Sequence, residues 1–173
     1  MKTGLITSIP RGTLSIVFAL TLSQALLFGP DARADGGNLI GTWVIQFTRV
    51  DCVTGAPIVQ NAELHTYMPN GTMLSSGTGN GPSPIVDHSD AHGIWEHTGA
   101  QTLREHFRFF NFDAAGVHVS TREVNIERVL VQGTNAEADQ IIGVGTQKLL
   151  TPAGVLLSQA CREDQGHRMA FEE

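Results

Sequence analysis

The sequence predicts an all-β fold, an eight-stranded antiparallel up-and-down barrel, and three observations lead to it. Apolar, β-branched segments follow one another from Asn38 onward, separated by short turns rich in Gly, Asn or Pro. Nineteen Gly and seven Pro in 173 residues leave few stretches long enough for a helix. The connections are too short for crossover helices, so successive strands pair antiparallel, and closure into a barrel protects both sheet edges. A two-sheet sandwich is the competing architecture.

The N-terminal segment has the pattern of a secretory signal peptide. Lys2 precedes the apolar run Leu14–Phe28, and Ala32-Arg33-Ala34 fits the small-x-small site that signal peptidase cuts. The run is shorter than the roughly 20 apolar residues that span a bilayer, which argues against a membrane anchor. We therefore expect residues 1–34 to be removed and residues 35–173 to form one barrel domain, secreted or periplasmic, with no stable membrane span.

Composition and charge limit the classes of function. With 41% hydrophobic and 16% charged residues, the chain has the composition of a globular domain rather than a disordered segment. Eleven Lys and Arg against seventeen Asp and Glu give a net charge of -6, and no basic cluster is present to neutralise a phosphate backbone. Nucleic acid is therefore not an expected partner, and the sequence leaves the oligomeric state open.

The first expected strand, Gly41–Cys52, shows the alternation on which the fold prediction depends. Trp43, Ile45 and Phe47 alternate with polar residues, which is typical of a strand with one buried face. The other seven strands are expected at 58–68, 72–78, 92–97, 102–112, 117–132, 139–150 and 155–162.

Turn signals separate these strands. Pro69-Asn70-Gly71 is a strong hairpin signal and sets the register of the strands on either side. Residues 79–91 contain several glycines and prolines that exclude regular structure, so we expect a loop or lid there. No structure is assigned to the acidic tail after Arg162.

Cys52 and Cys161 are the only cysteines, and an even pair in an exported domain predicts a disulfide. Barrel closure supports this pairing independently, because it places the first and last strands side by side with the two cysteines near each other. A thiol nucleophile is the alternative, but no local nucleophile signature surrounds either cysteine.

Gly41-Thr42-Trp43, at the start of the first expected strand, resembles the Gly-x-Trp signature of the lipocalin and calycin barrels. The eight-strand meander covers nearly all of residues 35–173, so the resemblance implies an eight-stranded barrel with one end closed by Trp43. It also implies that a basic side chain from the last strand packs on this tryptophan, and Arg162 is the matching residue. Asp51-Cys52-Val53-Thr54-Gly55 is similar to a motif of small exported bacterial barrel proteins of uncharacterised function. The allene oxide cyclase type of barrel has the same strand count.

Several expected strands carry polar residues on both faces, which bears on what the barrel interior holds. Glu63, His65 and Tyr67 share one face of the strand at 58–68, and neither face of the strand at 102–112 is purely apolar. A packed interior would alternate more cleanly, so we expect a cavity with a few polar groups on apolar walls. The candidate wall residues are Trp43, Phe47, Trp95, Phe107 and Phe109. The alternative is that each charge lies on the surface.

Ionisable side chains on these strands are candidates for chemistry. His97, Tyr67 or Glu63 could transfer a proton, because an imidazole, a phenol or a carboxylate can act as a general acid or base. Arg108 or Arg122 could stabilise an anion. We hypothesise that His97, Tyr67 and Arg108 form a polar cluster inside the barrel.

The segment Asp87–His92 concentrates imidazole and carboxylate groups, which together suit zinc or iron. Its spacing matches no established metal motif, and such loops are usually solvated. We therefore expect no metal site and no cofactor.

Three functions are compatible with this sequence. The first is an exported binding protein that holds a small, hydrophobic or amphipathic and mainly apolar ligand inside the barrel. The second is a cofactor-independent enzyme, an isomerase, cyclase or lyase, that uses the His, Tyr, Glu and Arg side chains of the same cavity. The third is a barrel filled by side chains that acts through its loops on another protein.

Overall fold

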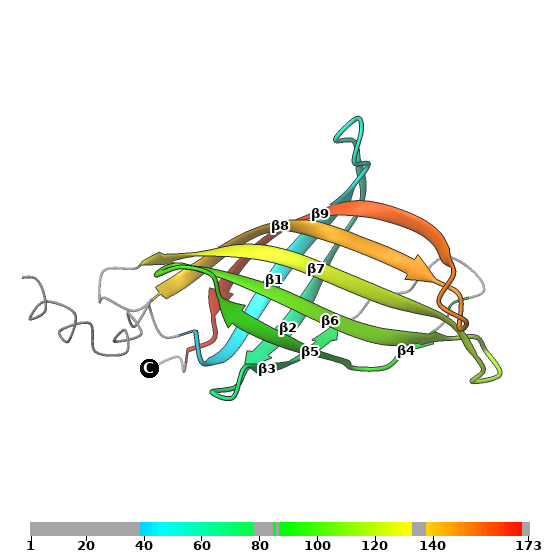
Figure 1. Ribbon diagram of the computed structural model, residues 1–173, viewed down its shortest axis with the longest axis horizontal. Helices are drawn as coiled ribbons and strands as arrows, with labels where there is room; N and C mark the ends of the chain where they lie inside the picture. Colours follow the sequence, from blue (N-terminus) through cyan, green and yellow to red (C-terminus); the bar gives the residue numbers. More distant parts are fainter. Residues whose placement is uncertain (1–38, 78–84, 86, 133–137, 171–173) are drawn as a thin grey trace, which may run out of the picture. The chain divides into compact units, whose positions relative to one another are not determined.

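The computed structural model describes residues 39–77, 85, 87–132 and 138–170. This described part contains strands and no helix (Figure 1). The strands are β1 (Gly41–Val50), β2 (Pro57–Tyr67), β3 (Thr72–Gly77), β4 (Asp87–His88), β5 (Ala91–His97), β6 (Thr102–Phe112), β7 (His118–Gln132), β8 (Ala138–Leu150) and β9 (Leu156–Arg168). All eight expected strands are present, with the short β4 in addition, and only the last is much longer than expected.

The strands form one closed antiparallel sheet. In chain order, β1, β2, β3, β5, β6, β7, β8 and β9 each pair with the next, and β9 pairs with β1. The two-residue strand β4 pairs with the same edge of β6 as β5 does, so β4 and β5 together occupy one position of an eight-stranded barrel. The predicted up-and-down barrel is confirmed, and the sandwich alternative is wrong.

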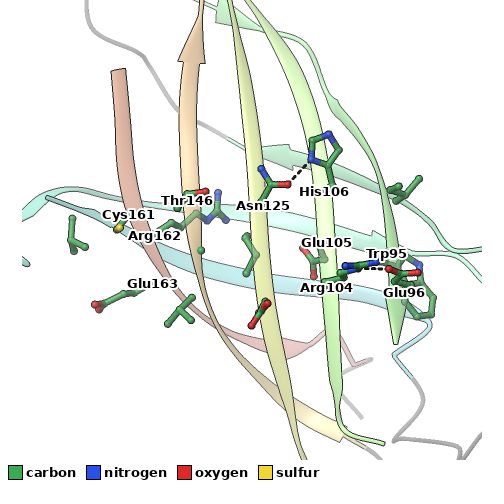
Figure 2. A pocket seen from close by; sticks show the side chains of 16 residues that line it. Trp95, Glu96, Arg104, Glu105, His106, Asn125, Thr146, Cys161, Arg162 and Glu163 are labelled. Atoms are coloured by element: carbon green, nitrogen blue, oxygen red, sulfur yellow. Dashed lines mark hydrogen bonds and ion pairs between the residues drawn. The ribbon is translucent and has the colours of Figure 1, made fainter. Parts of the chain in front are cut away.

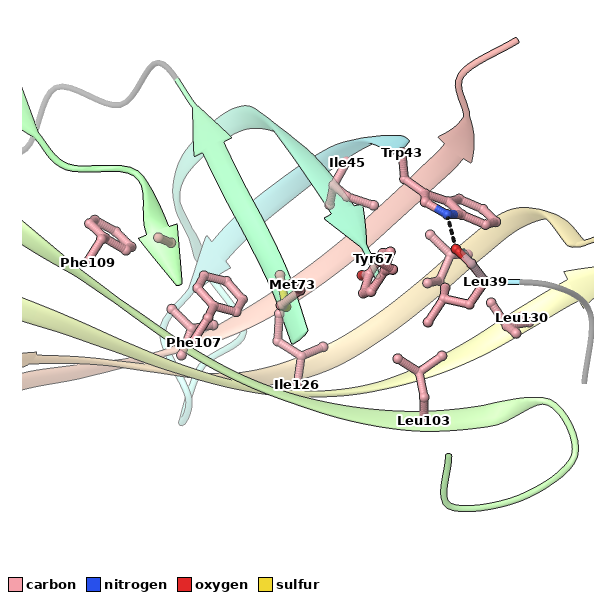
Figure 3. Packing of buried hydrophobic residues seen from close by; sticks show 13 residues of the cluster. Leu39, Trp43, Ile45, Tyr67, Met73, Leu103, Phe107, Phe109, Ile126 and Leu130 are labelled. Carbon is pink, nitrogen blue, oxygen red and sulfur yellow. Dashed lines mark hydrogen bonds between the residues drawn. The ribbon is translucent and has the colours of Figure 1, made fainter. Parts of the chain in front are cut away.

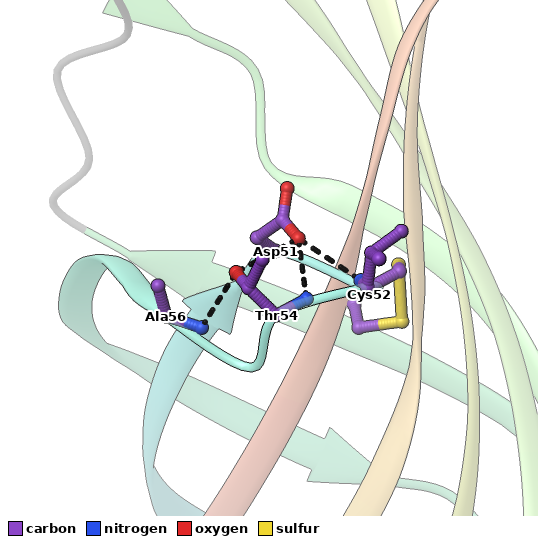
Figure 4. Close-up of a disulfide and its surroundings, with 6 residues drawn as sticks. Asp51, Cys52, Thr54 and Ala56 are labelled. Atoms are coloured by element: carbon purple, nitrogen blue, oxygen red, sulfur yellow. Dashed lines mark hydrogen bonds between the residues drawn. A yellow bond between two sulfur atoms is a disulfide. The ribbon is translucent and has the colours of Figure 1, made fainter.

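The disulfide joins the turn after β1 to the neighbouring strand β9, as expected from barrel closure. Cys52 and Cys161 are bonded with a Cα–Cα distance of 5.0 Å (Figure 4). Asp51 holds the turn that carries Cys52, because its Oδ1 accepts hydrogen bonds from the backbone N–H groups of Val53 and Thr54 at 2.9 and 2.8 Å. These hydrogen bonds, that of Thr54 first, lower the pKa of the Asp51 carboxyl. The Asp-Cys-x-Thr-Gly motif therefore forms a structured turn next to the disulfide.

Trp43 closes one end of the barrel. Its buried indole Nε1 donates a hydrogen bond of 2.9 Å to the carbonyl oxygen of Leu39 (Figure 3). The guanidinium of Arg168 lies 4.6 Å from the centroid of the ring and donates to the carbonyl oxygen of Ile40. The expectation that Arg162 packs on Trp43 is wrong, because β9 continues to Arg168, which is the register partner of Trp43.

The last part of β9, Glu163–Arg168, is polar and has the composition of a tail, yet it is a strand. Its buried positions are Asp164, which is paired with arginines, and Gly166. A Cβ at Gly166 would lie 2.4 Å from Cδ1 of Ile45, so the glycine makes room for that side chain. The strand therefore fits into the barrel without the apolar alternation by which a strand is usually predicted.

A cluster of buried apolar side chains packs inside the barrel (Figure 3). Its members are Leu39, Trp43, Ile45, Tyr67, Met73, Ala91, Leu103, Phe107, Phe109, Val124, Ile126, Leu130 and Ile141. A Cβ at Gly93 of β5 would lie 2.5 Å from Cβ of Phe107, so this glycine allows β5 and β6 to approach closely.

Some expectations fall outside the described residues. These are the signal peptide at 1–34 and most of the first half of the loop expected at 79–91. The second half of that loop contains β4 and the first residue of β5. Within the described ranges, no helix is long and apolar enough to cross a membrane.

Candidate functional site

The polar faces of four strands meet in the middle of the barrel. Glu63, His65 and Tyr67 all point inward from β2, since side chains alternate along a strand. They meet charged side chains from β6, β7 and β9. The whole set, called here the central network, consists of Glu63, His65, Tyr67, Glu105, Arg128, Arg162 and Asp164. All of these side chains are buried apart from that of Glu63, which is 11% exposed.

Two arginines organise the central network. Arg128 Nε donates to Glu105 Oε1 at 2.5 Å, and its Nη2 donates to Asp164 Oδ2 at 2.8 Å. Arg162 Nε donates to the other oxygen of Asp164 at 2.6 Å, and its Nη2 donates to Glu63 Oε2 at 2.8 Å. Asp164 thus links the two guanidiniums, and each guanidinium has two carboxylate partners.

His65 and Tyr67 complete the network on the β2 side. His65 Nε2 lies 2.9 Å from Glu63 Oε2, and its Nδ1 lies 3.4 Å from the Tyr67 hydroxyl oxygen. The Tyr67 hydroxyl donates a short hydrogen bond to Glu105 Oε1. The edge of the His65 ring faces Phe107, with 5.4 Å between the ring centroids. The two acid–base groups are therefore held between charges and aromatic rings, away from solvent.

The ion pairs dominate the titration of the network. Burial alone would raise the pKa of Glu63, but the charge of Arg162 and the hydrogen bond from His65 outweigh it and hold this pKa well below its usual range. Burial alone would likewise lower the pKa of Arg128 and Arg162, and the neighbouring carboxylates raise both instead. Burial is the main reason that the pKa of Tyr67 lies well above its ordinary value. The Glu63 carboxylate and the guanidiniums of Arg128 and Arg162 are therefore held in their charged forms, beside a neutral Tyr67 phenol.

A second group of inward side chains lies on β1, β6, β7 and β8, at the end of the barrel away from Trp43. We call it the arginine end. It consists of Phe47 and Arg49 of β1, Phe109 of β6, Arg122 of β7 and Gln147 of β8. Arg49 is the register partner of Arg162, and Arg122 is the register partner of Phe109. Since register partners lie on the same face of the sheet, Arg49 and Arg122 both point to the interior, as Arg162 and Phe109 do.

The guanidiniums of the arginine end have no carboxylate of their own. Arg122 is only 7% exposed, and neither Arg122 nor Arg49 forms an ion pair or hydrogen bond with any residue of the described part. Burial, and then the charge of Arg49, lower the pKa of Arg122 to about 10, against a weaker opposing effect of Glu63. Burial and the charge of Arg162 lower the pKa of Arg49. The buried Oε1 of Gln147 also lacks a partner.

A groove of about 780 Å³ crosses β5 to β9 (Figure 2). Each of these strands contributes three consecutive residues, of which the middle one points inward and its two neighbours point outward. The middle residues are register partners across the sheet: Trp95, Glu105, Ile126, Gly145 and Arg162. The groove therefore lies on the outer face, with the backbone of one paired row as its floor.

The outward side chains form the two sides of this groove. One side is lined by Glu96, Arg104, Glu127, Val144 and Glu163, and the other by Ile94, His106, Asn125, Thr146 and Cys161. Arg104 is ion-paired with Glu96, and His106 Nδ1 lies 2.7 Å from Asn125 Oδ1. Several of the polar groups of the groove are thus already paired with each other.

The structure brings some of the predicted site residues together. Glu63 and Tyr67 belong to the central network, and Arg122 belongs to the arginine end. The predicted wall residues all come from inward positions: Trp43, Phe47, Phe107 and Phe109 are buried, and Trp95 is partly buried against the core.

Two predicted site residues lie elsewhere. His97 is exposed at the end of β5, with its ring centroid 5.4 Å from that of Trp95. Arg108 points outward from β6, is 58% exposed, and forms an ion pair of 2.5 Å with Glu123. The predicted interior cluster of His97, Tyr67 and Arg108 is therefore wrong, because Arg108 has the strand parity opposite to that of the inward residues of β6.

Sequence reasoning missed part of the network, notably Glu105, Arg128 and Asp164. A usable signal was the register of the β6–β7 hairpin, which places Glu105 opposite Ile126 and therefore diagonal to Arg128 on the same face. Opposite charges at such diagonal positions indicate a pair. Asp164 gave no comparable signal, since its strand was not predicted to continue that far.

Among the described residues, no group of three or more His, Cys, Asp or Glu side chains is arranged to hold a metal ion. Comparison of the chain with protein-family models, with curated proteins and with solved structures found no match in any of the three.

Proposed function

We propose that this chain is an exported small-molecule-binding barrel whose ligand contacts the arginine end. The observation that carries the proposal is the difference between two parts of one interior. In the central network, each guanidinium has two carboxylate partners, and only Glu105 Oε2 and Arg128 Nη1 lack a hydrogen bond, whereas at the arginine end Arg122 is buried with no carboxylate partner in the described part and Gln147 Oε1 lacks a hydrogen bond. Buried polar groups are normally satisfied, so unsatisfied ones support a role for a bound molecule.

The filled middle of the barrel restricts where such a ligand could lie. Side chains such as Tyr67, Phe107 and Arg128 have almost no exposed surface, so they occupy the space between Trp43 and the arginine end. A ligand would then lie against Phe47 and Phe109, which supply the apolar contacts predicted for it. This arrangement leaves the Trp43 end closed.

Two features support the lipocalin-like and exported parts of the proposal. Arg168 of the last strand packs on Trp43 of the first, which is the arrangement that the resemblance to lipocalin barrels implies. The disulfide is compatible with an oxidising compartment, such as the periplasm or the extracellular space, and residues 1–34 would be the signal peptide.

The enzyme alternative receives less support from the same geometry. A general acid or base must touch its substrate, and Tyr67 is buried within the central network. Glu63 is partly exposed, but its carboxylate already interacts with Arg162 and His65.

The proposal can be tested with the uncharged fluorescent probe N-phenyl-1-naphthylamine. We expect the probe to bind to residues 35–173 and the Phe109→Ala variant to bind it about tenfold more weakly, since about 1.4 kcal/mol of lost contact is a factor of ten. Phe110→Ala is the matched control, because the next residue of the same strand points outward and is 48% exposed. Thermal melts check that each variant is folded, and Phe109→Leu replaces Phe109→Ala if the latter unfolds. If wild type binds no probe, or both alanine variants behave alike, the proposed site is wrong.

A further inference from the structure

We infer that the ligand class of this barrel is an organic anion, whose carboxylate, sulfonate or phosphate group is bound by Arg122 together with Arg49. The inference rests on the proposed function, since it concerns the same end of the barrel, and it adds the chemical class of the ligand and the residues that select it.

The interior arginines differ in their carboxylate partners. Arg128 has Glu105 and Asp164 as partners, and Arg162 has Asp164 and Glu63. Arg122 has no carboxylate within ion-pair distance among the described residues, although it is buried to the same degree as the core residue Phe109. A buried charge without a counterion is unfavourable. An anion bound next to Arg122 would therefore be stabilised more than one bound next to Arg128 or Arg162, which already have carboxylate partners.

Glu63 is already paired with other groups and is not available as a partner of Arg122. Its Oε2 lies 2.8 Å from Arg162 Nη2 and 2.9 Å from His65 Nε2, and its Oε1 lies 3.4 Å from Arg162 Nη1. Both carboxylate oxygens are therefore engaged elsewhere. The attraction of Glu63 for Arg122 is weaker than the combined effect of burial and Arg49, as the lowered pKa of Arg122 indicates.

Arg49 places a second positive charge near Arg122. Arg49 is close enough to Arg122 for the two charges to repel, and Arg162 acts on Arg49 in the same way. An anion next to Arg49 and Arg122 would relieve this repulsion and accept charge-assisted hydrogen bonds from both. The planar guanidinium fork suits carboxylate, sulfonate and phosphate oxygens, which can each accept two N–H groups.

Aromatic rings lie next to Arg122 and would contact the uncharged part of the ligand. Phe109 is the direct register partner of Arg122, and the ring of His88 lies 5.2 Å from that of Phe109. Phe47 already carries the Arg162 guanidinium on one face, 3.9 Å from its centroid. An anion with an apolar or aromatic body thus finds rings next to its charged group, whereas a small inorganic anion would leave them without contact.

The test compares two probes that differ by one charged group. 8-Anilinonaphthalene-1-sulfonate is N-phenyl-1-naphthylamine with an added sulfonate, so the ratio of their dissociation constants measures the contribution of the anion. We expect wild type to bind the sulfonate roughly 10- to 100-fold more tightly, because hydrogen bonds to charged groups contribute in that range. Arg122→Ala should remove this preference, which is read as the ratio of the two dissociation constants within the same variant. Arg49→Ala should reduce the preference partly, since Arg49 is the more exposed of the two.

Arg108→Ala is the matched control for charge, because it removes one arginine from the outer face of the strand next to Arg122. It should leave the preference unchanged. 8-Anilinonaphthalene-1-sulfonate should also raise the melting temperature of wild type, measured by circular dichroism, and should not raise that of Arg122→Ala, which provides a second readout independent of fluorescence. If the neutral probe binds but neither arginine variant changes the preference for the sulfonate, the inference is wrong and the proposed function stands. If neither probe binds to wild type, both are wrong.

Discussion

Replacement of Asp164 by Asn should lower the free energy of unfolding by about 3 kcal/mol. Asp164 accepts hydrogen bonds from Arg128 at 2.8 Å and from Arg162 at 2.6 Å, through different oxygens. Asparagine keeps the shape of the side chain but loses the charge, and one of its positions becomes an N–H donor that faces a guanidinium. Removing one partner of a buried pair typically costs about 3–5 kcal/mol. The lower value applies because Arg128 keeps Glu105 and Arg162 keeps Glu63.

Urea denaturation with the disulfide intact measures this effect. At a slope of about 2 kcal/mol per molar urea, a loss of about 3 kcal/mol lowers the midpoint by about 1.5 M. Glu163→Gln is the matched control, since it removes the same charge from the neighbouring, exposed position on the outer face and should leave the midpoint unchanged. A decrease of less than about 0.5 M for Asp164→Asn would refute the assignment of Asp164 as the link between the two arginines.

Three further predictions concern pH, the disulfide and the closed end. The pKa of Glu63 is lower in the folded chain than its ordinary value of 4.5, so its contribution to stability is complete above about pH 4.5 and is lost as the pH falls further. Between pH 7 and pH 3, the free energy of unfolding measured by urea titration should fall less for Glu63→Gln than for wild type. An equal fall in both proteins would contradict this. Replacing Cys52 and Cys161 by Ser should cost up to about 4–5 kcal/mol, because the bond closes a loop with a sequence separation of 109 residues, and reduced wild type should match the variant. Arg168→Ala should lower the melting temperature and change the near-ultraviolet circular dichroism of Trp43, and an unchanged spectrum would contradict their packing.

Much of the barrel could be predicted from local patterns. Alternation identified the buried face of β1, and turn residues such as Asn70-Gly71 placed the hairpins close to their observed positions. Barrel closure and the disulfide were consistent with each other, and both are confirmed. The end of β9 could not be predicted in this way, because Asp164 is satisfied by arginines that are distant in the sequence and Gly166 has no side chain to show a buried face.

The inward face of β6 was the decisive unknown for the site. One face carries Glu105 beside Phe107 and Phe109, and the other carries Arg108 beside Phe110, so each face mixes charged and aromatic residues. Counting charges favours the first face as the interior, since it holds one charge between large apolar side chains. That Glu105 can be buried depends on Arg128 of the next strand, and only the register between β6 and β7 reveals this partner.

The interior arginines should respond to substitution in opposite directions, and this separates a structural network from a ligand site. Arg128→Met leaves Glu105 and Asp164 buried with fewer partners, so it should destabilise the protein by about 3–5 kcal/mol. Arg122→Met removes a buried charge that has no counterion in the described part and adds an apolar side chain next to Phe109. It should therefore raise the urea midpoint of the free protein, as expected where binding is maintained at the expense of stability. A loss of stability for Arg122→Met similar to that for Arg128→Met would mean that Arg122 belongs to the structural network after all.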